Sequence, residues 1–278
     1  MKLISFLFVL SASVALASST PTKSSKSKTK KAVVVQAPDS AEVSGNSSSA
    51  SINTSDVNEE RHFHLRPILG YTFLSPKEVN NFLAEGGKTI GLTDTFKISG
   101  APMISAAADY SVIPQLSLGA RVDYFSASTD SVTSKNVLTA QASLSALPVY
   151  ATVTFSQPVM EKVSLGLMAG AGMPVFFRHS FEFSGSQNDN YPNGTLTYSS
   201  NPFSGFGTAF VNYDFTNRIA LRAEGGYRYL ASNQMKATSN YGKNNAIKDG
   251  ALFKDSSDRN INVDASAVNI GLSLALSM

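Results

Sequence analysis

The 278-residue chain contains no cysteine and no tryptophan, and charged residues make up only 15% of it. Without cysteine, the chain can form neither a disulfide framework nor a lipid anchor on a cysteine. After residue 17, no segment approaches the roughly 18 consecutive apolar residues that a membrane-spanning helix requires. If the mature chain is integral to a membrane, it must therefore be a closed β-barrel, because only helices and barrels satisfy their backbone hydrogen bonds in lipid.

Motifs that carry chemistry are also missing. There is no glycine-rich phosphate loop, no nucleophile elbow and no cluster with metal-ligand spacing. The histidines are His62, His64 and His179. His62 and His64 share one face of an extended segment, but no third ligand accompanies them, so we predict neither a metal site nor a cofactor. His179-Ser180 is the one pair placed for a lipid-modifying enzyme, yet adjacent strand residues face opposite ways. We therefore predict a protein without enzymatic activity.

The N-terminus indicates export. Met1-Lys2 precedes the apolar run Leu3–Leu10, and Ala15-Leu16-Ala17 follows. A positive start, a short apolar core and an A-x-A site are typical of a secretory signal peptide, which we place at residues 1–17. An uncleaved anchor is the alternative.

Residues 18–60 are rich in serine and lysine, and we expect a disordered periplasmic linker there because such a composition buries too little apolar surface to fold. The lysines of this linker are Lys23, Lys26, Lys28, Lys30 and Lys31. They form either a solvated tether or a contact with anionic lipid or cell wall polymer. They supply most of the net charge of +3, so the basic pI is no argument for nucleic acid binding.

The rest of the chain, residues 61–278, alternates with a period of two, which is typical of β-strands with one apolar face. In the last strand the large apolar residues are Val268, Ile270, Leu272, Leu274, Leu276 and Met278. We predict seven earlier strands at 62–73, 103–112, 116–125, 145–155, 163–177, 203–215 and 219–229. Short connections alternate with long ones at 74–102, 126–144, 178–202 and 230–264. This alternation predicts an all-β fold, an eight-stranded antiparallel up-and-down transmembrane β-barrel with a disordered N-terminal tether.

Aromatic residues on the apolar face gather at both strand ends. Phe63, Tyr110, Phe155, Tyr213 and Phe215 lie near the short turns, and Tyr71, Phe73, Tyr124, Phe177, Tyr227 and Tyr229 lie near the long loops. Two aromatic girdles around a band of smaller residues match the two interfaces of a membrane.

The final residues resemble the C-terminal signal read by the barrel assembly machinery of outer membranes. The positions that carry this resemblance are Asn269, Gly271, Leu274, Leu276 and Met278, where Met278 replaces the usual aromatic residue. Residues 62–278 as a whole resemble the small eight-stranded barrels of the outer-membrane protein A, X and W type. This resemblance implies a place in the outer membrane, among its lipid and lipopolysaccharide. It implies no single activity, because such barrels serve many roles.

The opposite face of the strands carries charges that we expect inside the barrel. They are Arg66, Asp109, Arg121, Asp123, Arg222, Glu224 and Arg228. Eight strands enclose a lumen just wide enough for side chains, and buried charges have to pair. We predict a network of arginines and carboxylates that plugs the lumen, and a gated pore lined by the same charges is the alternative.

Three further expectations concern local structure. Ser75-Pro76-Lys77-Glu78 predicts a helix start, and Gly86-Gly87 predicts its end.

The stretch 233–260 has few apolar residues and should be mobile. Pro67, Pro148 and Pro174 fall inside strands, where each removes a hydrogen bond. Bulges are expected at the latter two, whereas Pro67 marks either a bulge or a break between two strands.

We thus predict an outer-membrane barrel with an envelope structural or surface-interaction role and four mobile outer loops. A narrow channel for small or hydrophobic solutes is the main alternative. A lipid-modifying enzyme and a soluble lipocalin-like binder are lesser ones.

Overall fold

The structure, a computed structural model, describes residues 63–89, 97–133, 139–184, 193–242, 246–255 and 257–278. The predicted signal peptide, the predicted linker and His62 lie outside these residues. The elements of the described part are β1 (Phe63–Leu74), α2 (Lys77–Thr89), β2 (Ala101–Ile113), β3 (Leu116–Ser128), β4 (Val132–Thr133), β5 (Thr139–Met160), β6 (Val163–Ser184), β7 (Gly194–Ser200), β8 (Ser204–Thr216), β9 (Ile219–Ser232), β10 (Lys236–Ala237), β11 (Val263–Asp264) and β12 (Ala267–Ser277). Of the helical segments among these residues, none has both the length and the apolar character needed to cross a membrane.

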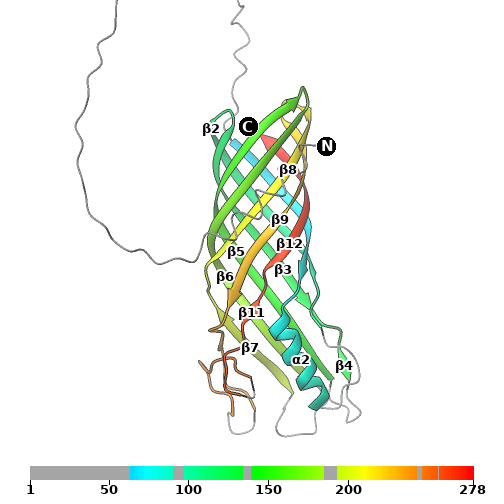
Figure 1. Cartoon of the computed structure of the whole chain (residues 1–278), viewed down its shortest axis with the longest axis vertical. Coiled ribbons are helices and arrows are strands. Elements are labelled where there is room, and N and C mark those ends of the chain that lie inside the picture. Colours follow the sequence, from blue (N-terminus) through cyan, green and yellow to red (C-terminus); the bar gives the residue numbers. More distant parts are fainter. Residues whose placement is uncertain (1–62, 90–96, 134–138, 185–192, 243–245, 256) are drawn as a thin grey trace, which may run out of the picture. The chain divides into compact units, whose positions relative to one another are not determined.

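Eight of the strands close into one antiparallel ring. The order around the ring is β1, β2, β3, β5, β6, β8, β9 and β12, and β12 pairs with β1 to complete it. Each long strand pairs with its neighbours in sequence, which is the up-and-down meander that the alternating connections predict. The ring confirms the predicted fold and each of the eight strands. In Figure 1 the short turns lie at the top of the barrel, and α2, β4 and β7 lie at the bottom. We call these the short-turn end and the long-loop end.

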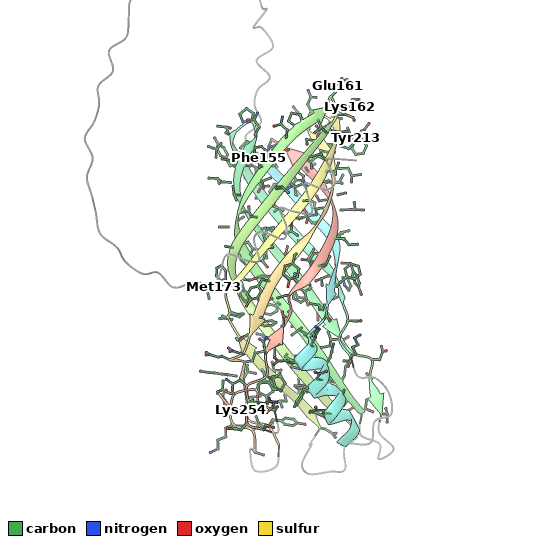
Figure 2. All side chains as sticks on the ribbon, viewed as in Figure 1. Phe155, Glu161, Lys162, Met173, Tyr213 and Lys254 are labelled. Atoms are coloured by element: carbon green, nitrogen blue, oxygen red, sulfur yellow. The ribbon has the colours of Figure 1, made fainter. Side chains whose placement is uncertain are left out.

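The outer surface of the ring is apolar over most of its height. Along β12, Val268, Ile270, Leu272, Leu274 and Leu276 are between 39% and 58% exposed, although water-soluble proteins rarely expose apolar residues in such continuous runs. We call the outward-facing apolar surface of the eight ring strands the belt. Figure 2 labels Phe155 and Tyr213 near its short-turn edge and Met173 farther toward the long loops.

The predicted girdle residues lie at the edges of the belt. The ten that point outward are 39–55% exposed: Phe63, Tyr71, Phe73, Tyr110, Tyr124, Phe155, Tyr213, Phe215, Tyr227 and Tyr229. The prediction for Phe177 is wrong, because its side chain is fully buried inside the barrel.

A β-bulge explains the inversion of Phe177. Ala146 pairs with Phe177 and Pro148 pairs with Pro174, so β6 has one residue more than β5 across this interval. The extra residue turns every following side chain of β6 to the opposite face. The expected bulge beside Pro148 and Pro174 is confirmed, and Phe176 rather than Phe177 reaches the outer face, where its ring contacts Tyr124.

Pro67 interrupts the seam between the first and last strands without splitting β1. Leu65 pairs with Leu276 and Ile68 with Ser273, so the register is unchanged across the proline. Neither Arg66 nor Pro67 has a partner on β12, although both pair with β2. The proline therefore removes ladder hydrogen bonds at the closing seam, and it marks neither a bulge nor a strand break.

Beyond the belt, the wall of the barrel continues as a taller structure. β5 and β6 each contain 22 residues, about twice the 9–11 that a membrane-spanning strand requires. The additional strands β4, β7, β10 and β11 pair onto β5, β6, β7 and β9 at this end. We call this region the extension. It corrects the expectation that residues 178–202 are a loop.

The polarity of the wall reverses in the extension. Along β5, Val149, Val153 and Phe155 face outward within the belt, whereas Ala142, Leu144 and Ala146 are fully buried. The apolar residues of β5 thus change face near Leu147 although the backbone alternation does not. An outer surface that meets water needs its apolar side chains inside, so this change marks where lipid contact ends.

Candidate functional site in the barrel lumen

All seven predicted interior charges lie inside the ring. They come from β1, β2, β3 and β9, on positions that alternate with the belt residues, and none is more than 7% exposed. Their positive members are Arg66, Arg121, Arg222 and Arg228, and their negative members are Asp109, Asp123 and Glu224. Four arginines and three carboxylates leave one positive charge in excess.

Arg121 connects opposite walls of the barrel. Its Nε atom donates to Asp123 Oδ1 at 2.7 Å on its own strand, and its Nη1 atom donates to Glu224 Oε1 at 2.7 Å. Around the ring, β3 and β9 are four strands apart in either direction. The Arg121–Glu224 ion pair therefore spans the diameter of the lumen.

Two further contacts also join strands on opposite sides of the ring, one between β9 and β3 and one between β1 and β6. The Arg228 guanidinium of β9 lies 4.0 Å from the ring centroid of Phe125 on β3, and Arg66 Nη2 of β1 lies 3.7 Å from Met168 Sδ on β6. Arg66 also forms an ion pair with Asp109 of the neighbouring strand. The lumen is thus bridged at three places by the long side chains of arginine.

Two of the arginines form no ion pair with a carboxylate among the described residues. Arg222 stacks 3.7 Å above the ring centroid of Phe210 and donates to Asn212 Oδ1 at 2.7 Å. Arg228 donates to Thr72 Oγ1 at 3.0 Å in addition to its contact with Phe125. The electron-rich face of a ring is attracted to a guanidinium, most strongly where water is excluded, so aromatic rings take the place of counter-charges here.

These aromatic partners were not predicted from the sequence. Phe206 and Phe210 point inward from β8, and Arg121 lies 5.1 Å from the ring centroid of Phe206. Their rings occupy the space where Cβ atoms would stand at Gly170 and Gly166 of β6. Both phenylalanines lie on positions opposite the apolar face of β8, and that placement was the signal that could have identified them.

A second polar cluster lies toward the short-turn end. The His64 ring nitrogens contact Ser277 Oγ at 2.9 Å and Ser111 Oγ at 3.1 Å, and Ser111 contacts Ser117 Oγ at 3.2 Å. Hydroxyl groups occupy both nitrogens, so no carboxylate orients His64 as in a catalytic triad. Among the described residues, no group of three or more His, Cys, Asp or Glu side chains could hold a metal ion.

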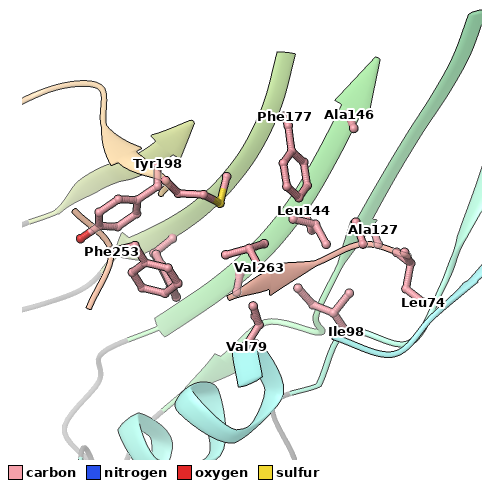
Figure 3. Packing of buried hydrophobic residues seen from close by; sticks show 14 of the residues in the cluster. Leu74, Val79, Ile98, Ala127, Leu144, Ala146, Phe177, Tyr198, Phe253 and Val263 are labelled. Carbon is pink, nitrogen blue, oxygen red and sulfur yellow. The ribbon is translucent and has the colours of Figure 1, made fainter. Parts of the chain in front are cut away.

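Toward the long-loop end the interior becomes apolar. Leu74, Ile98, Phe177 and Val263 belong to one buried cluster, shown in Figure 3. The helix α2 covers it with Val79 and Leu83, which are 0% and 3% exposed. This apolar cluster lies on the long-loop side of the charged lumen and closes the barrel with an ordinary hydrophobic core.

The segment 233–263, described at residues 233–242, 246–255 and 257–263, takes part in this core, which corrects the expectation that 233–260 is mobile. Met235, Phe253 and Ile261 are at most 4% exposed. Few residues of the segment are apolar, but Met235, Phe253 and Ile261 point inward. The average composition of the segment therefore did not predict that it packs on the core. The backbone N–H of Asn262 also donates to Glu78 Oε2 of α2 at 2.7 Å.

The helix itself differs from its prediction at one end. It begins at Lys77 as expected, but it continues through Gly86 and Gly87 to Thr89. Glycine weakens a helix without ending it, and the buried face of the helix outweighs the local preference. Glu78 lies in the first turn of the helix, and its side chain accepts a hydrogen bond from the backbone N–H of Asn262.

His179 lies in the same core, inside β6 and not in a loop. It is 0% exposed, its Nδ1 atom lies 2.9 Å from the Ser143 carbonyl oxygen, and its ring centroid lies 4.4 Å from that of Phe181. Burial lowers the pKa of His179 to about 4, so its ring is neutral and Nδ1 donates to the carbonyl at neutral pH. Ser180 points the other way and contacts Thr197, so this pair forms no catalytic dyad.

The fold defines this chain as a transmembrane β-barrel of the outer-membrane type, with eight strands and side chains filling its lumen. No protein-family model matches the sequence, and no curated protein sequence matches it.

Solved structures with a similar architecture are distant in sequence. Neisserial surface protein A, from Neisseria, is 12% identical, with 78% of this chain and 97% of that chain covered and a TM-score of 0.43. OprG from Pseudomonas aeruginosa is 8% identical, with 78% and 97% covered and a TM-score of 0.44. The outer membrane protease OmpT from Escherichia coli is 13% identical, with 78% and 97% covered and a TM-score of 0.34. These likenesses concern architecture and assign no activity.

Proposed function

We propose that the chain is a closed, non-conducting barrel of the bacterial outer membrane, without enzymatic activity, that acts through the surface of its extension. The observation that carries this proposal is the Arg121–Glu224 ion pair, which joins opposite strands across the lumen. The contacts of Arg66 with Met168 and of Arg228 with Phe125 support it. A solute passing through the barrel would have to displace all three.

The extension supports a surface role. α2 and the segment 233–263 pack onto a buried core, so the long-loop end presents folded surface. We propose that this end faces the exterior, because the predicted signal peptide implies export and the predicted linker enters at the short-turn end. The proposed partners are outer-membrane lipid and lipopolysaccharide around the belt, the assembly machinery at Asn269–Met278, and cell wall or anionic lipid at the lysines of the linker.

The test is the conductance of the refolded full-length protein in a planar lipid bilayer. With insertion verified by heat-modifiable gel mobility, we expect no discrete current steps. The double variant Arg121→Ala/Phe206→Ala removes two side chains from the lumen and should increase the current. Lys254→Ala, which removes the exposed pair with Asp258, is the matched control and should leave the bilayer silent. Reproducible openings of the native protein that change with Arg222→Ala or Glu224→Gln would instead establish the narrow channel.

A further inference from the structure

The wall of the barrel has a gap in the extension, on the long-loop side of the start of β8. β8 begins at Ser204, whereas β9 continues to Ser232 and β6 to Ser184. Among the described residues, β7 pairs with β6 and β10, while the end of β9 pairs with β11. β7 and β9 therefore do not pair with each other, and a cleft of about 810 Å³ opens between them.

Uncharged polar side chains line this cleft. Asn201, Asn233 and Asn260 contribute exposed amide groups from three separate segments. These side-chain amides form no hydrogen bond to another residue in the part of the chain that the structure describes. Each amide offers an acceptor oxygen and a donor nitrogen on one plane, so the cleft can satisfy hydroxyl groups, which both donate and accept.

The charges of the cleft balance. Lys236 contributes one positive charge and Glu78 contributes one negative charge. Glu78 already accepts the hydrogen bond from the backbone N–H of Asn262. This balance disfavours a polyanion or a polycation as the ligand, because neither would find complementary charge.

One aromatic side chain completes the lining. Tyr229 is 53% exposed and lies at the edge of the belt nearest the long loops, where it also borders the cleft. Among the lining residues, its ring supplies a flat apolar face in addition to the planar amides of the asparagines. A ligand with an apolar face and many hydroxyl groups fits this combination. Most specific ligand sites likewise combine apolar contact with a few precisely placed polar groups.

We propose that the cleft binds a neutral oligosaccharide, with one sugar ring against Tyr229 and its hydroxyl groups bonded to Asn201, Asn233 and Asn260. The inference rests on the proposed function in one respect, the outward orientation of the extension. Because Tyr229 belongs to the belt, the bound sugar lies at the boundary of lipid and water. Sugars of a glycolipid in the surrounding leaflet and free oligosaccharides share the required chemistry.

The first arm of the test applies the refolded full-length protein, in detergent, to a printed array of neutral bacterial and animal oligosaccharides. We expect binding to a subset of them. Tyr229→Ala should weaken that binding about tenfold, the loss that corresponds to one aromatic contact. Tyr227→Ala is the matched control, because Tyr227 lies on the same strand and is 54% exposed but lies outside the cleft lining. Asn233→Ala/Asn260→Ala should weaken binding without changing heat-modifiable mobility.

The second arm compares lipopolysaccharide that carries sugars with lipid A, which lacks the outer sugars. Tighter binding of the complete glycolipid than of array sugars assigns the cleft to the surrounding leaflet, and equal binding assigns it to free glycans. The inference is overturned if no neutral oligosaccharide binds, or if lipid A binds as tightly as the complete glycolipid. It is also overturned if Tyr227→Ala weakens oligosaccharide binding as much as Tyr229→Ala does. A barrel that is silent in the bilayer yet binds no sugar overturns this inference alone and leaves the closed barrel standing.

Discussion

At the scale of single residues, the lumen stabilises charge by two different means. Arg121 has carboxylate partners, whereas Arg228 lies against Phe125 and bonds to a threonine hydroxyl. Removing one member of a buried ion pair costs more than the pair itself contributes, because the remaining charge stays buried without a partner. Isosteric neutral substitutions should therefore lower the free energy of unfolding more in the buried ion pairs of the lumen than in the ion pairs on the surface.

Asp109→Asn should lower the free energy of unfolding by about 3–5 kcal/mol, because Arg66 then stays buried without its counter-charge. Urea unfolding in detergent or lipid vesicles measures the change. Adding Arg66→Met to the same chain should recover part of the loss, since both charges are then absent. Asp258→Asn is the control: the side chain of Asp258 is 86% exposed where it pairs with Lys254, so little change is expected. A loss for Asp109→Asn no greater than for this control would contradict the argument.

His179 should make the extension sensitive to acid. Its folded pKa of about 4 lies below the 6.5 of an unfolded histidine, so the unfolded chain binds the proton first as the pH falls. The stabilisation is complete above pH 6.5 and is lost as the pH approaches 4, by about 3 kcal/mol in total. Hydrogen exchange of β6 and of segment 233–263 at pH 7.5 and 4.5 should show this loss. In His179→Phe, which keeps an aromatic ring without a titrating nitrogen, the difference between the two pH values should shrink.

At the scale of elements, β5 and β6 show what a period-two pattern can and cannot predict. On β6 the odd positions are apolar from Val163 to Phe183 with the exception of His179, so the sequence reads as one uninterrupted strand. The bulge at residues 175–176 reverses the faces, while the environment reverses from lipid to water at the same level. Because both reversals occur at the same level, the apolar residues stay on the odd positions along the whole of β6. The sequence therefore predicted the strand correctly and Phe177 wrongly.

The absence of cysteine allows a direct test of this bulge. Arg178→Cys and Ser180→Cys should react with a water-soluble thiol reagent, because these positions face outward in the extension, beyond the belt. Phe181→Cys should not react, since that residue is 7% exposed. Ala171→Cys, which faces outward within the belt, should stay unreactive in lipid vesicles although it is exposed. If the odd positions beyond 176 react and the even ones do not, the bulge is absent.

The sequence predicted the ring and the inward placement of its charges because both depend only on alternation along single strands. The partners of those charges could not be predicted in the same way. Arg121 meets Glu224 across 103 positions of sequence, and that contact depends on ring closure and register. The order of segment 233–263 was likewise hidden, because Phe253 is buried against Phe82 of α2 and Tyr198 of β7, which are distant in sequence.

At the scale of the whole molecule, the belt distinguishes a membrane barrel from a soluble one. Leu272 is 58% exposed at mid-height of β12. Leu272→Lys should destabilise the lipid-inserted protein by about 2–4 kcal/mol, since the lysine faces the hydrocarbon region. Equilibrium unfolding in lipid vesicles measures this value. Ser126→Lys, an outward position on the long-loop side of the belt, is the control and should have little effect. A soluble lipocalin-like barrel would bury residue 272, and the native protein would then stay monodisperse without detergent.

The taller wall of β5 and β6 gives one chain two kinds of thermal behaviour. The belt already faces lipid in the folded barrel, so the melting of the barrel within a bilayer need not transfer its apolar surface to water. The core of Leu144, Phe177 and Phe253 is hydrated when it opens, as in any soluble domain. Hydration of apolar surface raises the heat capacity. Calorimetry should therefore find a heat-capacity increment that tracks the melting of the extension and depends little on lipid chain length, whereas the melting of the belt should follow bilayer thickness.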